Sequence, residues 1–361
     1  MTSTMINTTS RFFAVTALAL ALAVTATACG SSTTTGSTSP AAGATTPGST
    51  LGTAANAGAT GPAVAVKPAV TPTGKAASAR IHTPDGRDRT YHLYVPPTLA
   101  TSTAVPLLVA MHGGTGWATQ FEAQSGFDGL AESNNFIVAY PDGIVIPSLG
   151  HGEVWNAGRC CGAAGQDAQN VDDVGFISTM IDQIEASHDI DRSRVFAAGH
   201  SNGAMMGIRL GCELSDKVVA VGVQSGTLEL DQCHPDQKVS LLEIHGTADK
   251  NVPIEGGKGT AGISQADFRP PKSAIDAYVK ADECPADPST AIDPTNPDVT
   301  TDTSSPCGAG TAVQWMKVAG APHAWMGHAA DPGVAERGGV PYQKLDSSLV
   351  IWTFLAAHPR T

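Results

Sequence analysis

The stretch RVFAAGHSNGAMMGIRLGC, residues 194–212, decides the fold of this chain. Its first five residues are mainly apolar and predict a buried strand at 194–198. The centre, GHSNG at 199–203, has the pattern GxSxG, and the residues from 203 to 212 predict a helix. A serine in a sharp turn between strand and helix is exposed at the end of a sheet, and the glycines give the backbone room. The pattern therefore predicts Ser201 as a nucleophile.

Apolar runs and helical stripes alternate on both sides of this stretch. The expected strands are 79–83, 90–95, 105–111, 136–140, 218–223, 241–245 and 312–318, and the expected helices are 172–187, 271–281 and 347–357. Such alternation indicates an α/β fold with a mostly parallel sheet flanked by helices. We expect a single catalytic domain spanning residues 80–361.

A serine hydroxyl becomes a nucleophile only when a base takes its proton, and a carboxylate must orient that base. In this architecture the chain order is serine, acid, histidine. Asp249 follows the strand 241–245, and His323 follows the strand 312–318 in a loop rich in Gly and Pro. We predict them as acid and base. The remaining alternatives are His245 and His328 for the base, and Asp231 and Asp282 for the acid.

An oxyanion hole needs two backbone N–H donors. The N–H of Asn202, next after the nucleophile, is expected to be one of them. The second should come from the loop HGGTG, residues 112–116, which follows the strand 105–111. Within that loop the sequence leaves Gly114 and Thr115 as candidates.

Further motifs occur in a fixed order around the elbow: HGG at 112–114, WNAGRCCG at 155–162, VDDVGF at 171–176, HGTAD at 245–249 and HAW at 323–325. Together they resemble the polyhydroxybutyrate depolymerase and feruloyl esterase family, particularly its actinobacterial lipoprotein branch of LpqC-type esterases, over residues 80–355. The resemblance implies an α/β-hydrolase fold and serine esterase activity, and it supports Ser201, Asp249 and His323 as the triad. Members of the family cleave hydroxyalkanoate, feruloyl and acetyl esters, so the substrate stays open.

Three further residues are candidates for substrate contact. Trp155 and Trp325 could line an acyl or aryl pocket, although packing of the core near the site explains them equally well. His200, beside the nucleophile, is the third. Asp172 and Asp173 open the helix 172–187, where negative charge suits the N-terminal dipole, so we expect a structural role for them.

The N-terminus has the features of an export signal. Arg11 is followed by an uncharged, largely apolar run, and small residues precede Cys29, so residues 1–28 are expected to be a signal peptide. Cys29 resembles the lipidated cysteine of a bacterial lipobox, with simple secretion as the alternative. The rest of 29–79 is Gly, Ser, Thr, Ala and Pro with scattered valines, which predicts a flexible tether.

Six cysteines follow Cys29, and an even number in an exported domain suggests disulfides. They are Cys160, Cys161, Cys212, Cys233, Cys284 and Cys307. Pairing of Cys284 with Cys307 and of Cys212 with Cys233 is plausible, whereas the partners of the adjacent Cys160 and Cys161 stay open. The sequence has no CxxC pair, so we expect neither a zinc site nor another metal or cofactor.

The chain carries 33 acidic and 21 basic residues, a net charge of −12. It has no basic cluster, which argues against nucleic acid as a partner and against electrostatic docking on anionic lipid. We therefore expect contact with a membrane only through the N-terminal lipid.

The expected function is that of an extracytoplasmic serine esterase that forms an acyl-enzyme with a small ester or an oligomer. Candidate substrates are hydroxybutyrate oligomers, feruloyl or other aryl esters, and short-chain acyl esters. An acyltransferase that passes the acyl group to a sugar or lipid would use the same residues. A catalytically silent hydrolase fold that binds a surface is the non-enzymatic alternative.

Overall fold

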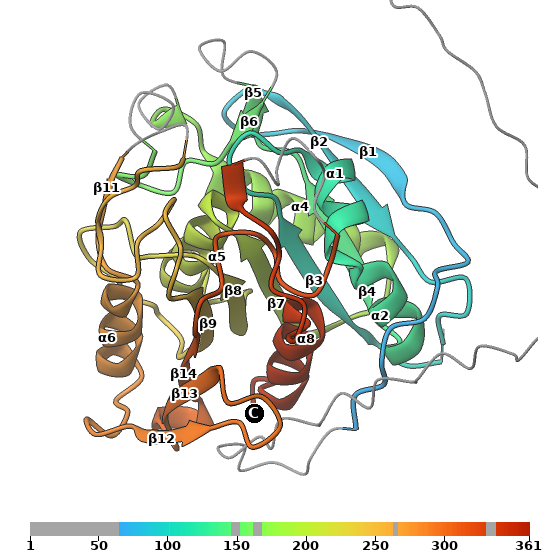
Figure 1. Ribbon diagram of the computed structural model, residues 1–361. Coiled ribbons are helices and arrows are strands. Elements are labelled where there is room, and N and C mark those ends of the chain that lie inside the picture. The colour runs from blue at the N-terminus through green and yellow to red at the C-terminus, as the bar shows by residue number, and fades with distance from the viewer. Residues whose placement is uncertain (1–64, 101, 146–151, 162–167, 263–265, 330–336) are drawn as a thin grey trace, which may run out of the picture. The chain divides into compact units, whose positions relative to one another are not determined.

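The structure is a computed structural model, and every described residue belongs to one compact unit, Gly52–Thr361 (Figure 1). The expected signal peptide 1–28, Cys29 and the greater part of the tether lie outside the described residues. The described ranges are 65–100, 102–145, 152–161, 168–262, 266–329 and 337–361.

A ten-stranded sheet forms the centre of this unit, in the strand order β1-β2-β4-β3-β7-β8-β9-β14-β13-β12. The strands are β1 (Ala77–His82), β2 (Asp88–Tyr94), β4 (Ile137–Pro141), β3 (Val105–Met111), β7 (Ile190–His200), β8 (Ala220–Gln224), β9 (Ser240–Gly246), β14 (Val313–Val318), β13 (Val299–Ser304) and β12 (Ser289–Ile292). The strands from β4 to β14 run parallel, and each edge carries two antiparallel strands. The predicted fold class, a mostly parallel sheet flanked by helices, is confirmed.

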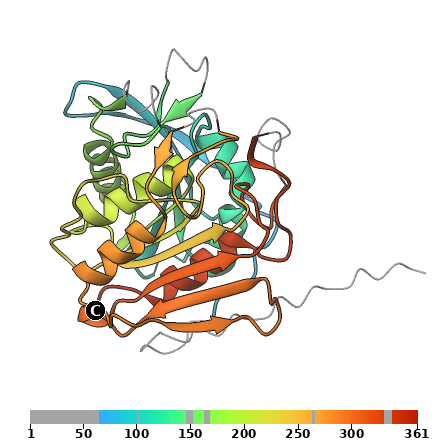
Figure 2. The same cartoon turned by 60° about the vertical axis from the view of Figure 1, so that its left-hand side comes forward.

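Helices cover both faces of the sheet (Figure 2). Along β3, Leu107 and Val109 face one core cluster while Leu108 and Ala110 face the other, because successive side chains of a strand point to opposite sides. The first cluster packs against α4 (Asp173–Ser187), α5 (Asn202–Glu213) and α6 (Lys272–Ala281); the second packs against α1 (Ala118–Ser125), α2 (Phe127–Asn134) and α8 (Ser347–Ala357). Burial on both faces explains why the inner strands are continuous apolar runs.

Shorter elements lie in the connections. They are β5 (Ile144–Val145), β6 (Glu153–Val154), β10 (Gly257–Lys258), β11 (Asp267–Phe268) and η2 (Gly308–Gly310). The pair β5–β6 is antiparallel, and Gly116 forms an isolated bridge to Glu153. This bridge brings the loop after β3 beside the β5–β6 hairpin.

Two parts of the fold differ from the sequence-based expectation. The helices α1 and α2 were not expected, since few apolar side chains mark them; α1 buries only two hydrophobic residues, Ala118 and Phe121. The segment between Cys284 and Cys307, where no strand was expected, contains β12 and β13. The Thr-rich β13 pairs with β14 along its whole length. Backbone pairing at the edge of the sheet thus makes a strand of a polar sequence that has no hydrophobic pattern.

The last part of the expected tether lies against the folded domain. The N–H of Lys67 donates to Asn134 Oδ1 at 2.7 Å, and the N–H of Thr73 donates to Glu132 Oε1 at 2.7 Å. Residues 67–74 therefore pack along α2 and lead towards β1, so the structured part of the chain begins before residue 80.

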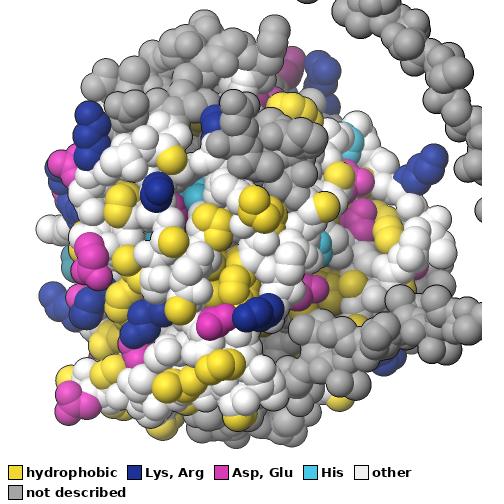
Figure 3. Space-filling view, in the orientation of Figure 1, with side chains coloured by type: hydrophobic (Ala, Val, Ile, Leu, Met, Phe, Trp, Pro, Cys, Tyr) yellow, Lys and Arg dark blue, Asp and Glu magenta, His cyan; other side chains and the backbone are white. Residues whose placement is uncertain are grey.

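The described cysteines form three disulfides. Cys212–Cys233 and Cys284–Cys307 confirm the two pairings that the sequence made plausible, and the adjacent Cys160 and Cys161 pair with each other. On the face that Figure 3 draws, described Lys and Arg side chains are scattered among acidic ones rather than gathered in one patch. Of the helices in the described ranges, none is long and apolar enough to cross a membrane.

Candidate active site

The predicted nucleophile elbow is present at the end of β7. Ser201 lies between the last residue of β7 and the first of α5, with φ 57° and ψ −120°. A Cβ on Gly199 would lie 2.3 Å from the carbonyl oxygen of Gly203, and one on Gly203 would lie 2.3 Å from the carbonyl oxygen of His112. Both positions therefore require glycine, because any side chain would collide with backbone.

Ser201, His323 and Asp249 form one hydrogen-bonded chain. The Ser201 hydroxyl lies 2.9 Å from His323 Nε2, and His323 Nδ1 lies 2.7 Å from Asp249 Oδ2. Ser201 follows β7, Asp249 follows β9 and His323 follows β14, so the carboxyl ends of three parallel strands deliver the three side chains. The alternatives lie elsewhere: His328 pairs with Asp346, Asp231 with Arg159 and Arg269, and Asp282 with the N–H of Val239, while His245 lies behind Asp249.

Asp249 is held as an ionised acceptor. Its Oδ1 accepts the N–H groups of Asn251 at 2.8 Å and Val252 at 2.9 Å, while Oδ2 faces His323. Burial opposes its charge, but the nearby His323 and these hydrogen bonds hold the pKa of Asp249 well below its usual value. A fixed carboxylate keeps the proton of His323 on Nδ1 and leaves Nε2 free to accept the serine proton.

Two buried side chains hold the loop that carries His323. His200 Nε2 donates to the His323 carbonyl at 2.7 Å, and Gln224 Nε2 donates to the Ala324 carbonyl at 3.0 Å. Gln224 Oε1 accepts the N–H of Met326 at 3.1 Å. Burial lowers the pKa of His200 to about 3, so this ring is neutral. His200, a candidate substrate contact by sequence, thus faces the loop, and Gln224 is a residue that the sequence did not single out.

The structure separates the two candidates for the second oxyanion donor. The Thr115 N–H donates to the Glu153 carbonyl at 2.7 Å and is therefore already engaged, which removes Thr115 as the donor. The Gly114 N–H has no hydrogen-bond partner among the described residues. A Cβ on Gly114 would lie 3.6 Å from that of Asn202, so this loop lies beside the start of α5, where the first N–H groups of a helix are unpaired.

His112 fixes the shape of the oxyanion loop. Its Nδ1 donates to the Gly113 carbonyl at 2.8 Å and its Nε2 accepts the N–H of Gly143 at 3.0 Å. The His112 carbonyl accepts from Trp155 Nε1 at 2.9 Å. The indole of Trp155 therefore supports the loop from inside the molecule.

Both tryptophans that were candidates for substrate contact lie in the core. Trp155 is 1% exposed and Trp325 is fully buried. Trp325 Nε1 donates to Ser348 Oγ at 3.1 Å, and its ring packs edge-on against Phe121 at a centroid distance of 5.3 Å. Their contacts are those of packing residues that hold the site in place.

Asn202 links the elbow to the segment that contains Trp155. Its Oδ1 accepts the Trp155 N–H at 2.7 Å and its Nδ2 donates to the Trp155 carbonyl at 3.2 Å. The same Nδ2 lies 3.5 Å from Cys160 Sγ and 3.4 Å from Cys161 Sγ. The adjacent-cysteine disulfide is thus packed directly against the residue after the nucleophile.

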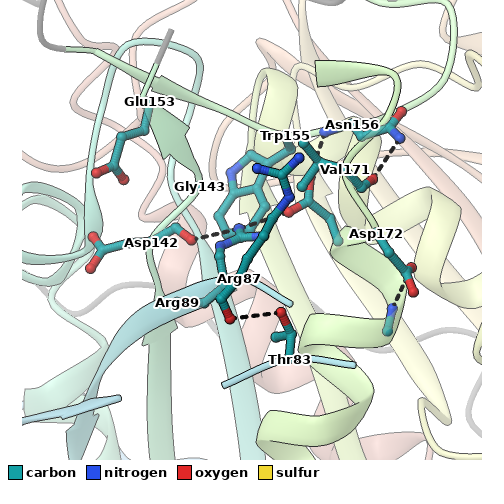
Figure 4. Close-up of polar contacts among 12 residues, drawn as sticks. Thr83, Arg87, Arg89, Asp142, Gly143, Glu153, Trp155, Asn156, Val171 and Asp172 are labelled. Carbon is teal, nitrogen blue, oxygen red and sulfur yellow. Dashed lines mark hydrogen bonds and ion pairs between the residues drawn. The ribbon is translucent and has the colours of Figure 1, made fainter. Parts of the chain in front are cut away.

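A buried ion pair supports this segment from below. Arg89 Nη2 lies 2.7 Å from Asp173 Oδ1 and also donates to the Asp142 carbonyl at 3.0 Å (Figure 4). The second oxygen of Asp173 accepts the Asn156 N–H at 2.7 Å. Asp172 caps α4 by accepting the N–H of the third residue after it. The structural role expected for both aspartates is confirmed.

The sequence of residues 89–253 matches the family described as esterase PHB depolymerase. The chain is 33% identical over 159 residues to feruloyl esterase B of Piromyces equi, covering 43% of this chain and 28% of that protein. It is 25% identical over 241 residues to the bifunctional acetylxylan esterase/xylanase of Neocallimastix patriciarum, covering 66% and 31%. The chain spans less than a third of the length of either relative.

A solved structure, that of an acetyl xylan esterase from Aspergillus awamori, matches with a TM-score of 0.51 at 17% identity. The match covers 71% of this chain and 96% of that one, and it shows the shared fold. The family match carries the relationship, because it includes the elbow with Ser201 and the strand end with Asp249. Residues 89–253, which include Ser201 and Asp249, are thus similar in sequence to the PHB depolymerase family of esterases.

Proposed function

We propose that this protein is a serine esterase that hydrolyses carboxylic esters through an acyl-enzyme. The observation that carries the proposal is the unbroken chain from Ser201 through His323 to Asp249 beside the backbone N–H groups of Asn202 and Gly114, neither of which has an acceptor among the described residues. The family match and the named activities of the relatives point the same way.

In this mechanism Ser201 Oγ bonds to the ester carbonyl carbon while its proton passes to His323 Nε2. The oxyanion accepts hydrogen bonds from the N–H groups of Asn202 and Gly114. The bond to the alcohol then breaks, and the alcohol leaves with the proton from His323. Water repeats the sequence on the acyl-enzyme and releases the acid.

Ser201→Ala tests the proposal on soluble acetyl, butyryl and feruloyl esters. Removal of the nucleophile should lower kcat by several orders of magnitude, leaving binding and oxyanion effects. Ser225→Ala is the matched control, because Ser225 is a serine that, like Ser201, has a positive φ, here 60°, and it is fully buried away from the triad's hydrogen bonds. A fluorophosphonate probe should label the control but not Ser201→Ala. A Ser201→Ala enzyme with a tenth of the wild-type turnover would refute the assignment.

We also propose that the protein is exported and anchored through a lipid on Cys29. The disulfides support export, since such bonds persist in oxidising compartments. The leader-like residues before Cys29 support the anchor. Wild-type protein should partition into the detergent phase of a membrane extract, and Cys29→Ala should not. Equal partitioning of both, with the leader removed from both, would contradict the anchor.

A further inference from the structure

A second histidine and a second carboxylate lie directly behind the acid of the triad. Glu243 and His245 both belong to β9, whose far end leads to Asp249, and both side chains are completely buried. The mechanism proposed above uses neither of them. A buried charged pair usually costs free energy relative to apolar side chains of similar volume, so its presence beside a reacting group calls for a functional account.

The contacts of His245 define where its protons lie. Nε2 is 2.8 Å from the carbonyl oxygen of Val252, which can only accept, so Nε2 carries a proton. Nδ1 is 2.8 Å from Glu243 Oε1, which also accepts the N–H of Gly226 at 3.2 Å. Burial opposes a charge on the ring, but the charge of Glu243 outweighs it and raises the pKa of His245 to about 9. Burial also raises the pKa of Glu243, but an acceptor at each ring nitrogen and the raised pKa of His245 both favour the imidazolium form at neutral pH.

This imidazolium lies against the triad. His245 Nε2 is 3.6 Å from Asp249 Oδ2, the oxygen that accepts from His323 at 2.7 Å. Val252 joins the two, because its N–H holds Asp249 Oδ1 and its carbonyl holds His245. Asp249 therefore stands between two imidazole rings, one of which carries a fixed charge.

The titratable groups of this cluster are Glu243, His245, Asp249 and His323, with His200 adjoining His323 at a ring-centroid distance of 4.9 Å. His200 is neutral. A carboxylate alone would stabilise the protonated form of His323, and protonated His323 cannot accept the serine proton, so activity would be lost at mildly acidic pH. A cation on the other side of that carboxylate offsets part of the effect.

Resting on the proposed esterase function, we propose that His245, kept charged by Glu243, is a positioning residue whose fixed positive charge keeps His323 unprotonated at lower pH than Asp249 alone would allow. A general base must be neutral to accept the serine proton. Glu243 and His245 thus extend the active pH range to lower pH, although neither contacts the substrate.

The pH profile of kcat/KM on a soluble ester tests this in the full chain. His245→Gln removes the cation, and Glu243 then either becomes neutral or adds negative charge. Either outcome should move the acidic limb upward by about 0.5 to 1 pH unit, the order expected for one partly compensated charge at this separation. A folded His245→Gln enzyme with lower kcat but an unmoved limb would overturn the proposal, since loss of structure alone does not shift the limb.

Asp282→Asn is the matched control. Asp282 is also a buried acid, and it contacts Val239 just before β9, at the opposite end of the strand from Asp249. Its substitution should leave the limb in place. A shift of the same size in this variant would show that loss of a buried ionisable group far from the triad moves the limb equally, and would likewise overturn the proposal.

Nitrogen-15 NMR of the histidine side chains provides a readout that needs neither activity nor a stable His245 variant. In the wild-type protein at about pH 8, both ring nitrogens of His245 should carry protons, and Glu243→Gln should remove one of them. A wild-type His245 with a single proton would contradict the proposal. The esterase assignment fails differently, by loss of fluorophosphonate labelling at Ser201, so the two failures are distinguishable.

Discussion

Gln224 offers the sharpest test of how the base is held in place. Gln224→Leu conserves approximate size but removes the partners of three buried groups, the Ala324 carbonyl, the Met326 N–H and the Ser347 hydroxyl. Each buried polar group left unpaired costs about 1 to 3 kcal/mol. Allowing for partial relaxation, the free energy of unfolding should fall by about 3 to 6 kcal/mol, measured by urea titration.

The same substitution should affect catalysis through His323. One contact would remain on its carbonyl, the hydrogen bond from His200 at 2.7 Å. A loop that keeps the base aligned for only a tenth of the time lowers kcat about ten-fold, because misplaced groups lose most of the advantage of fixed geometry. KM should change by less than about two-fold, since the substitution leaves Asn202 and Gly114 in place.

Gln314→Leu is the control for this experiment. Gln314 is also a buried glutamine, but it lies near the start of β14, at the opposite end of that strand from His323. Its side chain makes no hydrogen bond to the described residues, so its replacement leaves no other polar group among them without a hydrogen-bond partner. A Gln224→Leu protein that loses less than about 1 kcal/mol of stability, or that keeps its full kcat, would refute the argument that this side chain clamps the loop.

Four further outcomes are expected. Asp249→Asn should lower kcat by about 10³- to 10⁴-fold at neutral pH, because the wrong His323 tautomer is then favoured; stopped assays of ester hydrolysis measure it, and a loss under ten-fold would contradict the triad. Gly203→Ala should lower kcat in the same assay, because its Cβ would collide with the His112 carbonyl and displace the oxyanion loop; unchanged turnover would show that the loop is not so constrained. Arg89→Met should destabilise the fold by about 3 to 5 kcal/mol by leaving Asp173 buried without its cation, and Asp173→Asn added to it should restore part of the loss in urea titrations. Burial opposes the charge of Asp346, but His328 and the Leu349 N–H hold the pKa of Asp346 below its usual value. The stability that Asp346 contributes is therefore present above about pH 4 and lost as the pH falls further. In urea titrations, the difference in free energy of unfolding between wild type and Asp346→Asn should become smaller from neutral to acidic pH.

The triad could be predicted because each member follows a strand with a strong local signal. The elbow motif marks Ser201, and the apolar runs before Asp249 and His323 place both at strand ends. The oxyanion donor could not be fixed in the same way. The choice between Gly114 and Thr115 depends on a hydrogen bond to the distant Glu153, which no local pattern reveals.

Supporting residues were missed for a similar reason. Gln224 is the final residue of β8, one position beyond the strand end expected from the apolar run, and its partners lie about a hundred residues further on. A buried polar residue that ends an apolar strand is the signal that would have found it. The strands β12 and β13 have little hydrophobic pattern, because they form an edge of the sheet and β12 is exposed throughout.

The packing of residues 67–74 along α2 has a mechanical consequence. Tension applied to the chain upstream of residue 65 would meet the contacts of Lys67, Val70 and Thr73 with α2 before it reached the first strand. The next structure to bear the tension would be the six-residue pairing of β1 with β2. Ser201 and the other triad residues lie more than a hundred residues further along the chain. Tension applied upstream of residue 65 should therefore break the contacts with α2 first and leave the catalytic geometry intact.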